Sequence, residues 1–267
     1  MTTGDEMKKS AALFFVLAMI AVSGYGVGFM VTPPRYDLTM AAGHSQTYTI
    51  AIVNTDSIKP VRLQAQVLDW TMKPNGQLVY PKPGTFERGC SRWVEVNPTE
   101  FEVPPLANRE ARFTITVPDS TFGSYWAMLF FESQADTVAQ GMIGILMKGR
   151  VGAAIYLSIP GTEVKQAELV GFAYQRKGPG DHEFKIQVKN TGNVHVRCKG
   201  TLEIKDGAGT VAATAETNDD VVLPGLQRDL VVSLTKQLAP GRYTAVINLD
   251  CGTAELLQGE TSFEVAK

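Results

Sequence analysis

Two strand-like segments joined by an Asn-Thr turn occur twice in this chain, and this repeat is the feature that most limits how the chain can fold. The first copy is YTIAIVNTDSIKPVRLQ, residues 48–64, and the second is FKIQVKNTGNVHVRCKG, residues 184–200. Apolar and polar residues alternate in both, which is typical of strands with one buried face. Three more landmarks recur in the same order: Val61-Arg62 with Val196-Arg197, Pro105 and Arg109 with Pro224 and Arg228, and Gly123-Ser124-Tyr125 with Gly241-Arg242-Tyr243. Internal similarity of this length predicts two domains of the same kind.

The alternating pattern continues through most of the chain, for example in residues 109–118, 124–132 and 242–250. These segments are rich in Val, Ile, Thr and aromatic residues, and Asn, Asp, Gly and Pro separate them at intervals of about 8 to 12 residues. No segment has a convincing helical period. The pattern predicts an all-β protein made of two tandem immunoglobulin-like β-sandwich domains.

Each copy also contains a Gly-x-Tyr triplet at the start of a late strand. In sandwiches of this kind a tyrosine at such a place often forms a tyrosine corner, with a buried ring and a hydroxyl bonded to the backbone upstream. We therefore expect structural roles for Tyr125 and Tyr243. The alternative is that each is an ordinary half-buried aromatic residue of a strand.

The N-terminus has the features of a secretory signal. Lys8 and Lys9 precede an apolar run over 11–22, and small residues at Ser23 and Gly26 offer two cleavage sites. We predict a signal peptide over 1–26 and a periplasmic mature protein without a stable membrane anchor. The alternative is an uncleaved, membrane-tethering segment facing the periplasm, although the run is shorter than the ~20 residues that span a bilayer.

The domain boundary is expected near Pro160, where the last strand of the first copy ends. This gives domains over 27–160 and 161–267.

Export also implies an oxidising compartment. Cys198 and Cys251 both lie in the second copy, where either a disulfide or two unpaired thiols would fit, and Cys90 has no evident partner.

Residues that carry chemistry are sparse. None of the three histidines has a second ligand at metal-binding spacing, and the Gly-rich segments lack the spacing of a phosphate loop. The net charge of -2 gives no reason to expect nucleic acid as a partner. We therefore expect no enzymatic activity, no cofactor, no metal and no small-molecule substrate.

The segment 142–159, MIGILMKGRVGAAIYLSI, is unusual because apolar residues occupy nearly every odd position while Lys148 and Arg150 lie at even ones. Read as one strand, it is longer than strands usually are, so part of it is expected to project or to lie at a sheet edge. An exposed apolar edge strand is often used to pair with a partner chain. The alternative is that glycines break the run into two ordinary buried strands.

Three stretches together resemble a known family. PPRYDLTMAAGHSQTYTIAIVN over 33–54, WVEVNPTEFEVPPLANREARFTITVP over 93–118 and GSYWAMLFFE over 123–132, followed by the long alternating segment, are similar to the periplasmic chaperones of pilus assembly. The resemblance implies two immunoglobulin-like domains, with the last strand of the first domain lent to an incomplete pilin-like subunit.

The same resemblance implies roles for single residues. Ile143, Ile145 and Met147 match the side chains donated to the subunit, and Arg35 matches an arginine that binds the subunit's terminal carboxylate. The position nearest the family's second anchor, a lysine, is Ala153, and the nearest bases are Lys148 and Arg150.

Two functions follow from the sequence. The first is a periplasmic chaperone-like protein that binds an exported subunit, pilin-like or another surface protein, by donating an edge strand of domain one. The alternative is a structural or adhesive module of the cell envelope without chaperone activity.

Overall fold

The computed structural model describes residues 28–140 and 143–266, and for 136–140 and 143–146 it describes the backbone alone. The predicted signal peptide over 1–26 lies outside the described residues. Within the described ranges, no helix is long and apolar enough to cross a membrane.

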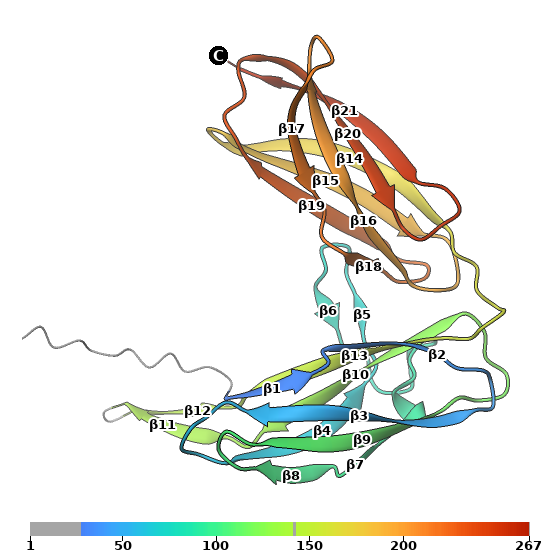
Figure 1. Cartoon of the computed structure of the whole chain (residues 1–267), viewed down its shortest axis with the longest axis vertical. Helices are drawn as coiled ribbons and strands as arrows, with labels where there is room; N and C mark the ends of the chain where they lie inside the picture. Colours follow the sequence, from blue (N-terminus) through green and yellow to red (C-terminus); the bar gives the residue numbers. More distant parts are fainter. Residues whose placement is uncertain (1–27, 141–142, 267) are drawn as a thin grey trace, which may run out of the picture.

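The first half of the chain folds into two sheets packed face to face (Figure 1). One sheet has the order β1 (Phe29–Thr32), β3 (Ser45–Asn54), β9 (Asn108–Thr116), β7 (Val94–Asn97). The other has the order β2 (Arg35–Thr39), β13 (Arg150–Ser158), β10 (Ser124–Ser133), β4 (Val61–Leu68), β8 (Glu100–Val103). Their facing side chains form one core around the fully buried Ile50, Phe113, Leu129 and Ile155. Alternation along the strands supplies these residues from both sheets.

The second half forms another pair of sheets. A three-stranded sheet has the order β14 (Ala167–Gly178), β15 (Asp181–Asn190), β19 (Gln227–Thr235). The facing sheet has the order β17 (Val211–Glu216), β16 (Val196–Asp206), β20 (Gly241–Asp250), β21 (Leu257–Val265), with β18 (Asp220–Val222) also paired to β16. Phe184, Leu202 and Ile247 are fully buried between the sheets. The predicted fold class, all-β with two sandwiches, is confirmed.

None of the described strands continues across Pro160. That the chain divides at this residue into two separately folding domains, 27–160 and 161–267, stays a prediction.

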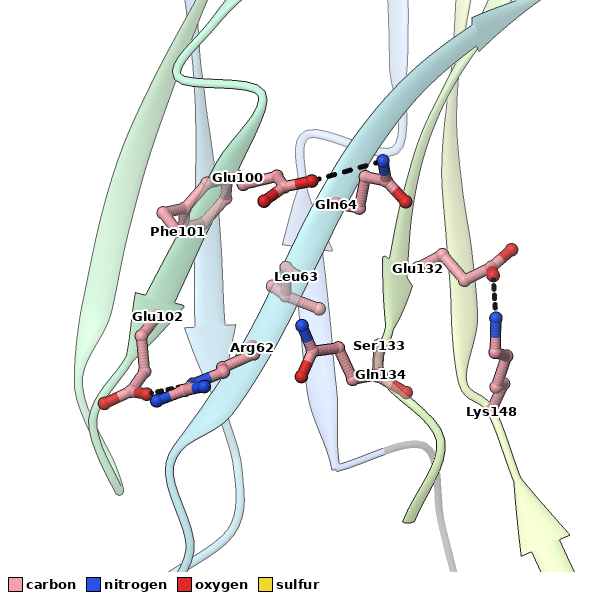
Figure 2. Close-up of a pocket in the computed structure, with 10 residues that line it drawn as sticks. All are labelled: Arg62, Leu63, Gln64, Glu100, Phe101, Glu102, Glu132, Ser133, Gln134 and Lys148. Carbon is pink, nitrogen blue, oxygen red and sulfur yellow. Dashed lines mark hydrogen bonds and ion pairs between the residues drawn. The ribbon is translucent and has the colours of Figure 1, made fainter.

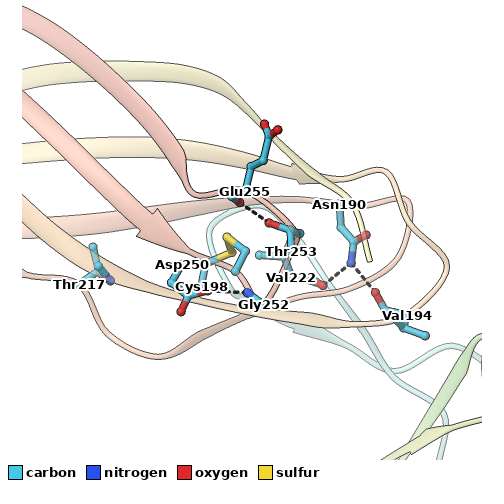
Figure 3. The surroundings of a disulfide bond; sticks show 11 residues. Asn190, Val194, Cys198, Thr217, Val222, Asp250, Gly252, Thr253 and Glu255 are labelled. Carbon is cyan, nitrogen blue, oxygen red and sulfur yellow. Dashed lines mark hydrogen bonds between the residues drawn. A yellow bond between two sulfur atoms is a disulfide. The ribbon is translucent and has the colours of Figure 1, made fainter. Parts of the chain in front are cut away.

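The cysteines differ between the halves. Cys198 on β16 and Cys251 just after β20 form a disulfide (Figure 3). Cys90 is a free, buried thiol whose pKa is raised by burial.

The asparagines of the sequence repeat make equivalent hydrogen bonds in the two sandwiches. The buried amide of Asn54 donates from Nδ2 to the carbonyl oxygens of Lys59 and Val103, at 2.9 and 3.0 Å. Asn190 donates in the same way to Val194 and Val222, both at 2.8 Å (Figure 3). In each copy the asparagine thus fastens the turn after one strand to the facing sheet. An asparagine fits here because its side chain carries donors and an acceptor together.

The Pro landmark of the repeat is a tight turn with a left-handed residue. Gly225 has φ +73° in the second copy, whereas Leu106, with φ +53°, occupies the equivalent place in the first. The amide of Ala107 bonds the oxygen of Pro104, as the amide of Leu226 bonds the oxygen of Leu223. The first copy therefore places a branched side chain where the backbone favours glycine.

The two Gly-x-Tyr tyrosines differ. The buried Tyr243 donates its hydroxyl to the carbonyl oxygen of Ala239 at 2.9 Å, which is the geometry of a tyrosine corner. Tyr125 is also buried, but its ring packs on Trp93 at a centroid distance of 4.5 Å. Among the hydrogen bonds of the described residues, none involves the Tyr125 hydroxyl, so this residue acts through packing.

The first copy is 17 residues longer than the second between the Asn and Pro landmarks. The additional chain forms the short hairpin of β5 (Thr71–Met72) and β6 (Leu78–Val79), a loop, and the 3-10 helix η1 (Ser91–Trp93). Figure 1 shows β5 and β6 standing between the two sandwiches. As a result both faces of β10 are buried, one in the core of the first sandwich and the other under this hairpin.

Replacing Leu106 by Gly is expected to raise the free energy of unfolding by about 0.5–1 kcal/mol. Relief of the left-handed backbone outweighs the greater entropy of a glycine in the unfolded chain, and the leucine side chain is 69% exposed. Urea denaturation measures the change. Leu256→Gly is the matched control, since Leu256 is 65% exposed and has an ordinary φ, and this variant is expected to lose stability. A loss of stability in both variants would contradict the prediction.

Candidate partner-binding edge

The segment 142–159 is two strands rather than one. β12 (Ile143–Met147) pairs with β11 (Asp136–Gln140) as a separate hairpin, and β13 begins again at Arg150. Of the two readings of this segment, a single long strand is wrong, and a break into two strands at a glycine is what the structure has. Its physical cause lies on the facing strand, where three residues between Glu132 and Asp136 oppose two residues between Met147 and Arg150. This extra residue makes a β-bulge, which bends the strand and interrupts the ladder.

The bulge is held by specific hydrogen bonds. The amide of Gly149 donates to the Ser133 hydroxyl oxygen, and the amide of Ser133 donates to the Gly149 carbonyl, both at 2.8 Å. The amide of Gln134 turns away to the carbonyl of Arg62 at 3.1 Å. The hairpin β11–β12 therefore starts from a fixed base, and it extends beyond the first sandwich (Figure 1).

The second half of the segment lies in the interior of its sheet. β13 is placed between β10 and β2, and β2 runs parallel to it from the pair Ala154 and Arg35 to the pair Ser158 and Thr39. Ile155 and Leu157 are fully buried in the core. The expectation of an exposed edge is therefore wrong for residues 154–159.

Before Ala154 the same segment is paired on one side only. β12 pairs with β11, and residues 150–153 pair with β10, while β2 begins its pairing at Ala154. Within 28–140 and 143–266 no strand pairs with the other side. The amide of Ala154 bonds the carbonyl of Pro34 across that side, at 3.0 Å. Because amide directions alternate along a strand, the amides of Arg150 and Gly152 point to the same, unpaired side.

The side chains around this edge are partly described. Met147 is 46% exposed. The side chains of Ile143 and Ile145 lie outside the described residues. Arg150 stacks over the ring of Phe130 at 3.8 Å and donates to Gln66, and Lys148 pairs with Glu132 at 2.9 Å. The two bases predicted to contact a partner are thus held along the strand by neighbouring side chains.

A polar cavity of about 490 Å³ opens beside the bulge (Figure 2). Most of its charged lining is paired: Arg62 binds Glu102 at 2.8 Å, and the Lys148–Glu132 pair lies at the other side, while Glu100 accepts a hydrogen bond from Gln64 at 3.3 Å. The described lining contains no His or Cys, and within the described part of the chain no three His, Cys, Asp or Glu side chains are grouped to hold a metal. The charged side chains at the two sides of the cavity are therefore held in ion pairs within the chain.

Arg35 lies at the junction of the sandwiches rather than at the unpaired edge. Its guanidinium binds Asp37 at 2.7 Å and reaches Asp219 of the second sandwich at 3.6 Å. Arg197, also from the second sandwich, contacts the same two carboxylates at 3.7 and 3.8 Å. The two arginines are therefore neutralised within the chain.

Arg197 and His195 also belong to this junction cluster, which their alternating sequence segment does not indicate. The signal that was present is the repeat, because Arg197 is the counterpart of Arg62. The ring of His195 lies on Tyr156 at a centroid distance of 4.7 Å, and its Nδ1 is buried and has no hydrogen-bond partner among the residues that the structure describes. Burial lowers the pKa of His195 to about 4, with Arg197 and Lys165 acting in the same direction and Asp37 opposing them.

No family model matches the chain, and no curated protein matches it. Among solved structures, the class 5 fimbriae chaperone CfaA is similar over 90% of this chain and 99% of its own, at 14% identity and a TM-score of 0.46. The CupB2 chaperone of Pseudomonas aeruginosa is similar over 89% and 100%, at 14% identity and a TM-score of 0.42. The CsuC–CsuE chaperone–tip adhesion subunit pre-assembly complex of Acinetobacter baumannii is matched over 87% and 97%, at 11% identity and a TM-score of 0.45.

The chain resembles fimbrial chaperones. These are proteins of the kind that the sequence resembles. At identities and TM-scores this low, the likeness assigns no partner to this chain, and any argument about binding depends on the chain's own geometry.

His195 is expected to make the stability of the protein depend on pH. In the unfolded chain His195 binds a proton with the ordinary pKa of 6.5, and in the folded chain with a pKa of about 4. The contribution of the neutral, buried His195 to stability is therefore complete above pH 6.5 and is lost as the pH falls toward 4. The loss is about 2 to 3 kcal/mol. Urea unfolding of His195→Gln between pH 7 and 4 is expected to show a shallower decline than the parent protein. His44→Gln, which changes an exposed histidine, is the control, and equal declines in all three proteins would contradict the prediction.

Proposed function

We propose that this protein is a chaperone-like binding protein that captures an exported, β-rich subunit by strand addition at the unpaired edge of β12 and of residues 150–153. The observation that carries the proposal is the register: β2 covers β13 from Ala154 onward, and no described strand covers the preceding residues on that side. Unpaired backbone groups in a row are a template for another strand.

The surroundings support this proposal. The bulge at Ser133 and Gly149 fixes where the hairpin β11–β12 leaves the sheet, so the hairpin is presented from a rigid sheet. The half-exposed Met147 adds apolar surface, and the predicted donors Ile143 and Ile145 lie on the same strand. The partner expected from this arrangement is an incomplete sandwich, pilin-like or from another surface protein, that lacks one strand.

Arg35 enters the proposal as a secondary contact. It lies on β2, which begins where the unpaired edge ends, and it is about half exposed. Because Asp37 and Asp219 already neutralise it together with Arg197, a carboxylate of the partner would have to displace an internal carboxylate. Backbone pairing, rather than this charge, is therefore expected to supply most of the affinity.

Arg150→Pro tests the role of the backbone edge. Proline removes an amide that points to the unpaired side, whereas Arg150→Ala keeps the amide and removes the same side chain. Loss of one hydrogen bond is expected to weaken partner binding roughly five- to tenfold in the proline variant relative to the alanine variant. Binding is measured on the exported subunit recovered by pull-down from the producing cell and identified by mass.

A second pair of variants tests the apolar part of the edge. The double change Ile145→Asp and Met147→Asp is expected to abolish co-purification of the subunit. Val170→Asp is the control and is expected to leave co-purification unchanged, since Val170 is as exposed as Met147 but lies on β14 of the second sandwich. Capture that is the same in both proteins, with folding verified by circular dichroism, would favour a structural envelope module instead.

A further inference from the structure

The inserted segment 70–89 takes no part in the proposed strand addition. It follows β4 in the chain, forms the hairpin β5–β6 and ends beside β10, where Gly89 bridges to Trp126. The segment therefore lies on the outer face of the first sandwich and next to the second (Figure 1). The equivalent part of the second copy has no such insertion. A segment present in one copy alone is where a specific function of that copy is expected.

The segment is fastened to the first sandwich at several points. The buried carboxylate of Asp69 accepts hydrogen bonds from the amides of Gly84 and Ser91, at 2.7 and 2.9 Å. The indole of Trp126 on β10 donates to the carbonyl of Trp70 at 2.7 Å. Each of these groups is held by charge-assisted or buried hydrogen bonds, so the segment is a fixed part of the first sandwich.

The tip of the hairpin is bonded to the second sandwich. The carbonyl oxygen of Pro74 accepts from the amide of Asp229 at 2.8 Å and from Nη1 of Arg228 at 3.2 Å. Arg228 is itself mostly buried and is oriented by Asp220, whose carboxylate accepts from Nη2 at 3.0 Å. Gly76, with φ +84°, lies under this guanidinium, and a Cβ there would overlap it.

An apolar contact lies below this polar one. Leu223 of the second sandwich is fully buried in a cluster with Trp70, Trp126 and Tyr156 of the first. The two sandwiches are therefore joined by shared apolar surface as well as by hydrogen bonds.

Two further contacts lie elsewhere along the junction. Next to the linker, the amide of Ser124 donates to the carbonyl of Asn193 at 3.0 Å, and the amide of His195 donates to the Ser124 hydroxyl at 2.9 Å. The cluster of Arg35, Asp37 and Asp219 forms the other. A linker contact alone leaves a hinge, since relative motion of domains is the usual behaviour of small interfaces.

We propose that the inserted segment 70–89 is a strut that fixes the angle between the two sandwiches, with the Pro74–Arg228 contact as its lock. In the first copy the position equivalent to Arg228 is Arg109, which is exposed on β9, so the repeat supplied an arginine that the second copy uses for this lock. The strut does not depend on the proposed function. It predicts one orientation of the sandwiches in the free protein.

Pulsed electron paramagnetic resonance between nitroxides at Arg112→Cys and Thr214→Cys tests the proposal. Both sites are exposed and lie on different sandwiches, whereas Cys90 is buried and Cys198 and Cys251 are paired. The parent protein is expected to give one narrow distance distribution. Gly76→Val, which displaces the Arg228 guanidinium, and Arg228→Ala, which removes it, are both expected to broaden the distribution and extend it to longer distances.

Gly209→Val is the matched control, because Gly209 has nearly the same φ, +82°, and has open space around its Cβ. Its distribution is expected to equal that of the parent protein. Distributions in Gly76→Val and Arg228→Ala that match Gly209→Val, in proteins whose circular dichroism is unchanged, would overturn the proposal.

Discussion

The strand β2 covers β13 only from Ala154 onward, and this limit of pairing determines what the last segment of the first sandwich does. From Ala154 to Ser158 the strand has neighbours on both sides and its alternate side chains lie in the core. Before Ala154 the same segment has a neighbour on one side within the described residues. Buried backbone groups require partners, whereas groups at an exposed edge bond water until another strand replaces it.

The unpaired edge and the junction between the sandwiches occupy different parts of the molecule. The edge lies at the bulge of Ser133 and Gly149 and continues into the hairpin β11–β12, while the junction is built by the inserted segment around Trp70 and Leu223. β10 connects them, because it pairs with β13 along the edge and its second face is buried beneath the insertion. A rigid sheet behind an unpaired edge reduces the entropy that the edge loses when a partner binds.

Several features could be predicted from the sequence because they depend on local patterns. Alternation predicted the strands, and the recurrence of Asn54 and Asn190 predicted two copies of one fold, since both asparagines fasten equivalent turns. A break of the long run at a glycine was one of two readings of the sequence, but the position of the break, at Lys148 and Gly149, could not be predicted in this way. It depends on how many residues the facing strand contributes between Glu132 and Asp136, and that count is set by pairing rather than by the segment itself.

The same reason explains the other differences. The parallel pairing of β2 with β13, which buries Ile155 and Leu157, joins residues more than a hundred positions apart. His195 stands in an alternating segment that suggests a solvated side chain, but the approach of Tyr156 from the other sandwich covers it. Contacts of this kind follow from the arrangement of whole sheets, which no single segment encodes.

Amide hydrogen exchange of the free, monomeric protein, followed residue by residue along 150–155, tests the central claim most directly. Because this stretch is paired with β10 on one side and uncovered on the other, the amides of Arg150 and Gly152 are expected to exchange fast. The amides of Val151 and Ala153, which point toward β10, are expected to exchange slowly. The amide of Ala154, bonded to Pro34, is expected to exchange slowly as well. Equal and strong protection of all five amides in the free monomer would contradict the existence of an unpaired edge.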